Sequence, residues 1–159
     1  MAAEYSANAI QTVAAGGSVI FTESPVPCNK GLIYHRDESG AFRLASPTVI
    51  GCSCRRRCCC GEYPTANYKV SFNANIQIPE GGEVGPISLA VAIDGETDPS
   101  SIMTFTPAAV EQLGNVGADV IVAVPCICRC SSVSIRNVSE QAIQVQNANI
   151  VFDFAGVRQ

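Results

Sequence analysis

The sequence predicts an all-β fold, a sandwich or barrel of antiparallel strands. The chain has 159 residues, the usual size of a single domain. It contains 17 Val and 14 Ile against only 4 Leu, and pleated strands prefer β-branched side chains whereas helices prefer Leu. Strand-like segments also follow one another at the short spacing typical of sandwiches and barrels.

The clearest strand covers residues 68–78. Its even-numbered residues, from Tyr68 to Ile78, are apolar and its odd-numbered residues are polar, which is the pattern of a half-buried strand. Pro79-Glu80-Gly81-Gly82 then ends it with turn residues. The other expected strands are residues 18–22, 32–36, 42–45, 86–94, 102–106, 119–124, 132–138 and 143–154.

Two connections carry local signals. Asp37-Glu38-Ser39-Gly40 predicts a hairpin loop between the second and third expected strands. The last strand changes phase, because its apolar residues are odd-numbered up to Val145 and even-numbered from Ala148 onward. A β-bulge near Gln146 and Asn147 would reconcile the two phases.

One short helix is expected over residues 108–113. Thr106 can cap it, Pro107 fits the first helical position and Gly114 suits its exit. For domain organisation, residues 1–15 are expected to form an N-terminal arm and residues 16–159 a single domain, with a cysteine-rich insertion at 51–61.

Residues 120–124, Val-Ile-Val-Ala-Val, are apolar on both faces. In an antiparallel sheet this pattern means that the second face is covered as well. We expect another subunit to cover it; the N-terminal arm and the short helix are the alternatives. The residues expected at the oligomer interface are Val120, Val122, Val124, Tyr68, Asn73 and Asn75.

A tetrapeptide occurs twice in the chain. Asn73-Ala74-Asn75-Ile76 recurs as Asn147-Ala148-Asn149-Ile150. If the two strands that contain it are neighbours in one sheet, their asparagines would form a polar row across the strands.

Charge and composition exclude several classes of protein. The net charge is −4 and the one basic run, Arg55-Arg56-Arg57, is too short for a polycationic patch, so nucleic acid is not expected as a partner. No apolar stretch approaches the roughly 20 residues that span a bilayer. Residues 1–10 carry an acid where a signal peptide needs positive charge, so a secretory signal is not expected.

Residues suited to catalysis or to metal binding are sparse. His35 is the only histidine, and we expect it to be structural. Asp94, Glu96 and Asp98 form an acidic turn that does not match a calcium-binding loop. The chain has no glycine-rich phosphate loop and no dinucleotide fingerprint. We therefore expect no enzyme, no cofactor and no metal.

Several of these segments together resemble the jelly-roll trimer family of tumour necrosis factor and the globular heads of complement, including bacterial and phage versions on surface fibres. The resemblance spans residues 12–154 and rests on residues 17–21, the hairpin of 33–36 with 42–44, and residues 68–72, 89–95 and 143–154. It implies a jelly roll of about eight to ten strands and a homotrimer built around the sheet that holds the first, third, sixth and last strands. A collagen-like stalk is missing, and the cysteine-rich insertion departs from the family.

Nine cysteines are the unusual feature of the composition: Cys28, Cys52, Cys54, Cys58, Cys59, Cys60, Cys126, Cys128 and Cys130. On the jelly roll that the resemblance implies, all nine would gather at one end of the sandwich. Adjacent cysteines pair poorly, because a disulfide wants Cα atoms farther apart than chain neighbours are. The cluster at residues 52–60 has five thiols and the remaining positions have four. Four bridges between the two sets would leave one thiol over, which suggests an intermolecular bond.

Other chemical states of the thiols remain open. Zinc sites usually use paired cysteines in two separated sets, and the spacing here fits that pattern poorly; free thiols are the third possibility. Arg55, Arg56, Arg57 and Arg129 would favour the thiolate form, or would simply solvate an exposed loop.

The function expected from these observations is a non-enzymatic structural subunit of an extracellular assembly. It would self-associate as a trimer or polymer, be locked by disulfides, and reach oxidising surroundings without a signal peptide, for example by cell lysis. A phage virion component and a spore-surface appendage both fit, so capsid and spore-surface proteins are the expected partners besides the chain itself. The alternative is a jelly-roll module that binds carbohydrate or a receptor, although the chain has no Trp.

Overall fold

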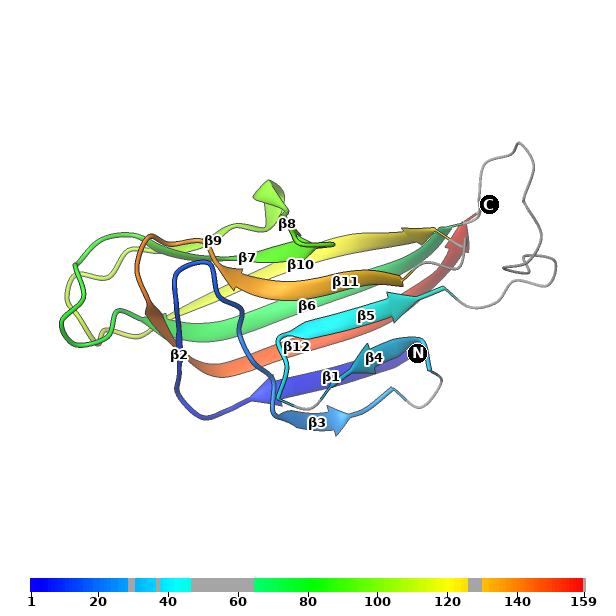
Figure 1. Cartoon of the computed structure of the whole chain (residues 1–159), viewed down its shortest axis with the longest axis horizontal. Helices are drawn as coiled ribbons and strands as arrows, with labels where there is room; N and C mark the ends of the chain where they lie inside the picture. The colour runs from blue at the N-terminus through cyan, green and yellow to red at the C-terminus, as the bar shows by residue number, and fades with distance from the viewer. Residues whose placement is uncertain (29–30, 37, 47–64, 126–129, 159) are drawn as a thin grey trace.

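The computed structural model describes residues 1–28, 31–36, 38–46, 65–125 and 130–158. They form two antiparallel sheets that face each other (Figure 1). The first sheet contains, in spatial order, β10 (Gly114–Pro125), β6 (Thr65–Gln77), β12 (Ile143–Arg158), β1 (Ala2–Ala7) and β3 (Glu23–Val26), and β2 (Gln11–Val13) pairs with β12. The expected all-β sandwich is confirmed.

The second sheet lies across the core from the first. It contains, in order, β4 (Ile33–His35), β5 (Ala41–Ala45), β11 (Cys130–Asn137), β7 (Ile87–Ile93) and β8 (Glu96–Thr97), and β9 (Met103–Phe105) pairs with β7. The expected strand at residues 18–22 is reduced to two isolated bridges, Ser18 with Arg136 and Phe21 with Ser39. This segment runs along the second sheet, because the Val19 amide donates to the Ile135 carbonyl oxygen at 2.8 Å and the Phe21 amide donates to the Ser39 carbonyl oxygen at 3.1 Å.

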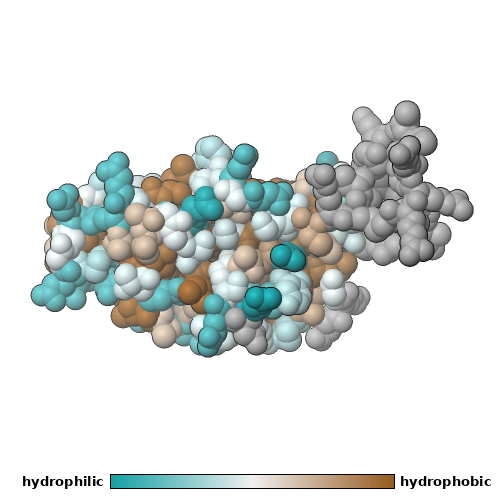
Figure 2. Space-filling model, in the orientation of Figure 1, coloured by the Kyte–Doolittle hydropathy of each residue, from teal (hydrophilic) through white to brown (hydrophobic). Residues whose placement is uncertain are grey.

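The core fills the space between the two sheets. The alternation predicted for β6 is confirmed, since its even-numbered side chains from Ala66 to Ile76 are all buried. The centre of the core is aromatic: the Phe42 ring centroid lies 4.3 Å from that of His35, 4.8 Å from that of Phe152 and 4.9 Å from that of Tyr5. On the surface in view, hydrophobic residues are scattered among hydrophilic ones (Figure 2).

The bulge expected in the last strand is confirmed. The pairing of β12 with β6 shifts register between Gln146 and Asn149, and Asn147 takes a left-handed backbone conformation with φ of 52°. The bulge lets Val145 and Ala148 both point into the core. A second irregularity, at Gly156 with φ of 111°, was not expected; it carries β12 on to Arg158.

Residues 1–15, expected as an arm, contain two strands of the first sheet. β1 pairs with β12 over six residues, from Ala2 opposite Asp153 to Ala7 opposite Ala148. The composition Ala-Ala-Glu-Tyr-Ser-Ala is too small and mixed to display a strand period, yet Ala3 and Tyr5 are buried. The cysteine-rich insertion at 51–61 lies outside the described residues.

The helix expected over residues 108–113 is absent from this segment, and that prediction is wrong. Glu111 has a left-handed φ of 59° and its amide donates to the Ile78 carbonyl oxygen at 2.8 Å, which breaks any helical run. In the part of the chain that the structure describes, the helical element is one 3-10 turn, η1 (Pro99–Ser101), capped by Asp98. No helix in that part is long and apolar enough to cross a membrane.

Candidate functional site

The outward surface of β10, β6, β12 and β1 is the candidate for self-association, and we call it the assembly face. Four residues expected at an interface do not lie on it. Val120, Val122 and Val124 are 8%, 1% and 0% exposed and Tyr68 is 0% exposed, because all four point into the core of their own chain. Since a partner subunit cannot reach them, their assignment to the interface is wrong.

The residues that β10 turns outward are the alternate ones. Ile121 is 61% exposed and Ala123 is also exposed. Ile121 lies opposite Lys69 of β6, and Ala123 lies opposite Asn67. As the sequence predicted, the strand at residues 120–124 has a second apolar side. That outward side consists of Ile121 and Ala123 and not of the valines.

Asn73 and Asn75 do lie on the assembly face. The two strands that share a tetrapeptide are neighbours, as expected, and Asn73 is in register with Asn149. Asn75 accepts a hydrogen bond of 3.1 Å from the Asn115 amide, and the Asn149 amide donates to a Glu4 carboxylate oxygen at 2.6 Å. The expected polar row is present, and its bonds run sideways to flanking strands rather than from one tetrapeptide to the other.

The chain segments that lead to the cysteine clusters meet at one end of the sandwich. Ala45, before the segment 47–64, lies opposite Cys130, and Thr65, after it, lies opposite Pro125. The Tyr68 hydroxyl donates to the Ala45 carbonyl oxygen and so ties the two sheets together at this end. Figure 1 shows both chain termini on the same side.

Of the nine cysteines, the structure describes two. Cys130 is exposed, and the Cys28 Sγ lies 3.6 Å from the Met1 Sδ. Met1 is held at this end because its carbonyl oxygen accepts from the Phe154 amide at 2.9 Å. Seven predicted thiols lie outside the described residues: Cys52, Cys54, Cys58, Cys59, Cys60, Cys126 and Cys128.

A buried tyrosine lies beside Cys28. Tyr5 is 4% exposed, and its burial raises its pKa above the ordinary 10.0; the backbone of Cys28 opposes this shift by hydrogen bonding and the Cys28 thiol adds to it. The phenol is thus held in its neutral form among the rings of His35, Phe42 and Phe152.

This pKa shift predicts a loss of stability at alkaline pH. In the unfolded chain Tyr5 ionises near 10.0, while in the folded chain it ionises at a higher pH. The stability that it contributes is therefore complete below the unfolded pKa and declines as pH rises toward the folded pKa, by up to about 1.4 kcal/mol per pH unit. This loss is measured as the free energy of unfolding in urea of the wild type and of Tyr5→Phe, each at about pH 8 and at about pH 11.

The variant isolates Tyr5, because every other titrating group is common to both chains. We expect the wild type to lose stability relative to Tyr5→Phe on going to the higher pH. An equal difference in the free energy of unfolding at both values would contradict the raised pKa.

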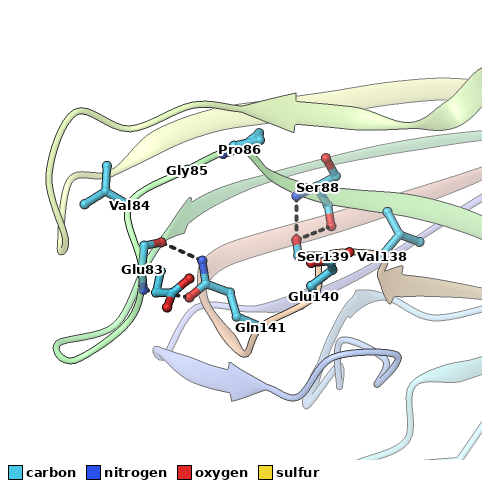
Figure 3. A pocket seen from close by; sticks show the side chains of 9 residues that line it. All are labelled: Glu83, Val84, Gly85, Pro86, Ser88, Val138, Ser139, Glu140 and Gln141. Atoms are coloured by element: carbon cyan, nitrogen blue, oxygen red, sulfur yellow. Dashed lines mark hydrogen bonds between the residues drawn. The ribbon is translucent and has the colours of Figure 1, made fainter.

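A groove lies at the opposite end of the sandwich (Figure 3). Its volume is about 680 Å³, and it is lined by Glu83, Val84, Gly85, Pro86, Ser88, Val138, Ser139, Glu140 and Gln141. No local sequence pattern predicts this groove, because its residues come from two turns that lie far apart in the chain: Glu83 and Gln141, which are hydrogen-bonded to each other, are 58 residues apart.

Hydrogen bonds within the groove satisfy most of its polar groups. The Gln141 side chain donates to the Glu83 carbonyl oxygen at 2.7 Å and accepts from the Glu83 amide at 3.0 Å. Buried Asn137 anchors the wall: its amide donates to the carbonyl oxygens of Val13 and Gln141 at 3.0 and 2.9 Å. The groups left to meet a ligand are the carboxylates of Glu83 and Glu140.

The other residues considered for chemistry have structural partners. His35 Nε2 is 3.0 Å from the Ser39 carbonyl oxygen, and its ring stacks on Phe42. Asp94 accepts from the Ser132 amide at 2.8 Å, and Asp98 accepts from the Ser100 amide at 2.9 Å. These two carboxylates of the acidic turn therefore hold backbone in place.

Comparisons with protein-family models and with curated proteins found no match. Among solved structures, the chain is similar to Eiger TNF from S. frugiperda, with a TM-score of 0.65 and 9% identity over 100% of this chain and 94% of that one. It also matches the CBM22-1 xylan-binding domain of Paenibacillus barcinonensis Xyn10C, with a TM-score of 0.37 and 10% identity over 98% and 95% of the two chains. The first likeness establishes a jelly-roll β-sandwich like that of tumour necrosis factor.

Proposed function

We propose that this chain is a non-enzymatic structural subunit that self-associates through its assembly face into an extracellular assembly. The observation that carries the proposal is the outward side of β10, where Ile121 is 61% exposed beside exposed Ala123. An exposed isoleucine on a sheet face costs free energy in water. A second copy placed over it would remove that cost.

The polar residues of the assembly face favour burial against a copy. Ser71 and Asp119 are hydrogen-bonded to each other, and the Gln77 amide donates to Gln144 at 2.6 Å. Lys69 lies opposite Asp153 in the register of β6 and β12. Because unpaired polar groups are what make burial expensive, the groups of this face that are already paired within the sheet can be covered at low cost.

The free edge of β10 also favours self-association. Among the described strands only β6 pairs with it, although β10 extends over 12 residues. Its single charged residue is Asp119, and it has no proline before Pro125. A long edge strand with little charge is open to association unless something covers it. The family resemblance supplies a suitable arrangement, a homotrimer built around this sheet.

Disulfides are proposed to lock the assembly. The described flanks of both cysteine-bearing segments converge on one end of the sandwich, where Ala45 lies opposite Cys130 and Thr65 opposite Pro125. Five thiols of one cluster facing four others leave one for a neighbouring copy. This density of cysteines in a chain of one-domain length is typical of oxidising surroundings, so a virion or spore surface is the proposed location.

The test is the intact mass and the oligomeric state of the purified protein with and without reductant. Without reductant, we expect covalent multimers and a subunit mass lowered by two hydrogens per bridge; with reductant, the multimers should separate on a denaturing gel. Electron microscopy of the non-reduced material should show regular particles or fibres. Nine free thiols in a strictly monomeric protein would overturn the proposal and favour a carbohydrate- or receptor-binding module.

A further inference from the structure

A second hollow lies on the outer side of the other sheet, on the β4–β5 hairpin. It is lined by Tyr34, Arg36, Ser39, Ala41 and Arg43 and has a volume of about 350 Å³. In the pairing of β4 with β5, Tyr34 lies opposite Arg43 and His35 opposite Phe42. Because His35 and Phe42 pack into the core, the alternation of the strands turns Tyr34 and both arginines outward together.

The two arginines have no ion-pair partner among the described residues, where the ion pair found joins the Met1 amino group to Asp153. Across the sheet, the Asp94 carboxylate accepts from the amide of Ser132, the residue opposite Arg43, at 2.8 Å. In a chain with a net charge of −4, two guanidinium groups that line one hollow and have no ion-pair partner in the described part of the chain form a local site for an anion.

The hairpin holds this hollow in a fixed shape. The Ser39 amide donates to the Arg36 carbonyl oxygen at 3.1 Å, and the Ser39 carbonyl oxygen accepts from the Phe21 amide at 3.1 Å. The Ser39 hydroxyl accepts from the Ala41 amide at 3.1 Å. At Gly40 a Cβ would lie 2.8 Å from the Val19 carbonyl oxygen, so the turn packs closely against residues 18–22. The backbone of the turn is therefore already in position before a ligand binds.

Besides the two arginines, an aromatic ring lines the hollow. Tyr34 is 60% exposed, which is unusual for a large side chain that packs well in cores. Its ring offers an apolar face next to the cationic groups. An acidic sugar has the matching parts, because its carboxylate or sulfate can be gripped by a guanidinium fork and the C–H side of its ring can lie on a tyrosine.

We propose that this hollow binds one acidic sugar unit, a hexuronate or a sulfated hexose, of an anionic glycan. Arg36 and Arg43 hold the anion and Tyr34 carries the sugar ring. The volume is at the lower end of the roughly 300–1,000 Å³ of small-molecule pockets, which suits a single sugar unit. The hollow is on the opposite sheet from the assembly face, so assembled copies keep it accessible. An acidic peptide would supply the anion without the flat apolar ring.

The test is calorimetric titration of the whole chain with a trigalacturonate and a heparin-derived hexasaccharide. Arg36→Gln and Arg43→Gln should each weaken binding roughly tenfold or more, because each removes hydrogen bonds to a charged group. Tyr34→Ala should weaken the binding of both sugars but leave the binding of inorganic sulfate unchanged. Arg158→Gln removes one positive charge on the first sheet, outside the hollow, and should change affinity less than about twofold.

Two comparisons separate the proposal from general attraction to anions. A neutral trisaccharide should not bind, and a glutamate hexapeptide should bind at least about tenfold more weakly than the acidic sugars. Equal losses from Arg158→Gln and Arg36→Gln, equal affinity for the glutamate peptide, or no binding of either acidic sugar would each overturn the proposal. Thermal unfolding of every variant checks that the hairpin remains folded.

Discussion

Replacing Ile121 with lysine should dissociate the assembly and leave the sandwich folded. The side chain is 61% exposed in the single chain, so the substitution removes little apolar burial from the core. At an interface between copies, however, it would place a cation where apolar contacts are needed, beside Lys69 on the neighbouring strand. Loss of such a central contact costs about 2 to 4 kcal/mol, or roughly 30- to 700-fold in the association constant.

Sedimentation velocity with reductant present measures this effect without covalent links. The wild type is expected to sediment as an oligomer and Ile121→Lys as a monomer at the same concentration. Ile102→Lys is the matched control, since Ile102 is 49% exposed at the end of η1, off the assembly face. A variant at position 121 that sediments like the wild type, or an Ile102→Lys variant that dissociates equally, would show that the assembly face is not the interface.

Replacing Phe42 with alanine should lower the free energy of unfolding by about 3 to 5 kcal/mol, the usual cost of removing a buried phenylalanine. Phe42 is 0% exposed and contacts rings from both sheets: Tyr5 and Phe152 from the first, and His35 from its own hairpin. The cavity would lie where the two layers meet. Because β5 is short and Phe42 is one of its two buried side chains, the surroundings cannot easily close over the gap.

Urea unfolding followed by tyrosine fluorescence measures the effect, and Phe42→Leu is the matched control. Leucine keeps most of the volume and should cost less than half as much as alanine. Phe154→Ala provides a second comparison, because Phe154 is only partly buried at the rim of the core. A loss no larger for Phe42→Ala than for Phe154→Ala would show that the aromatic cluster does not join the sheets as described.

Strands with strong alternation were predictable from the sequence. The segment at residues 68–78 became β6, Thr65–Gln77, and the bulge expected near Asn147 lies there. Both inferences use the period of two that the pleat imposes on side chains. β1 was not predicted, because alanine and serine differ too little in hydrophobicity to show a period of two. Its place in the sheet comes from its pairing with β12.

The candidate sites were harder to foresee. The β4–β5 hollow brings together Tyr34, Arg36 and Arg43, which the sequence shows only as polar positions of an ordinary hairpin. The groove at the opposite end joins Glu83 to Gln141 by hydrogen bonds, and no local pattern relates two residues so distant in the chain. The helix expected over residues 108–113 failed for a similar reason, because the Glu111 amide bonds to Ile78 of a distant segment.

By itself, the sequence determined that this protein is an antiparallel β-sandwich with a doubly apolar strand at residues 120–124. Only the tertiary structure decided which side of that strand faces the core. Val120, Val122 and Val124 are buried and Ile121 is exposed because pairing with β6 places Val120 opposite buried Val70 and Ile121 opposite Lys69. A shift of one residue exchanges every side chain between the two faces of a sheet. When both faces are apolar, the pairing with the partner strand decides which side chains face outward, and here it turned Ile121 outward and the valines inward.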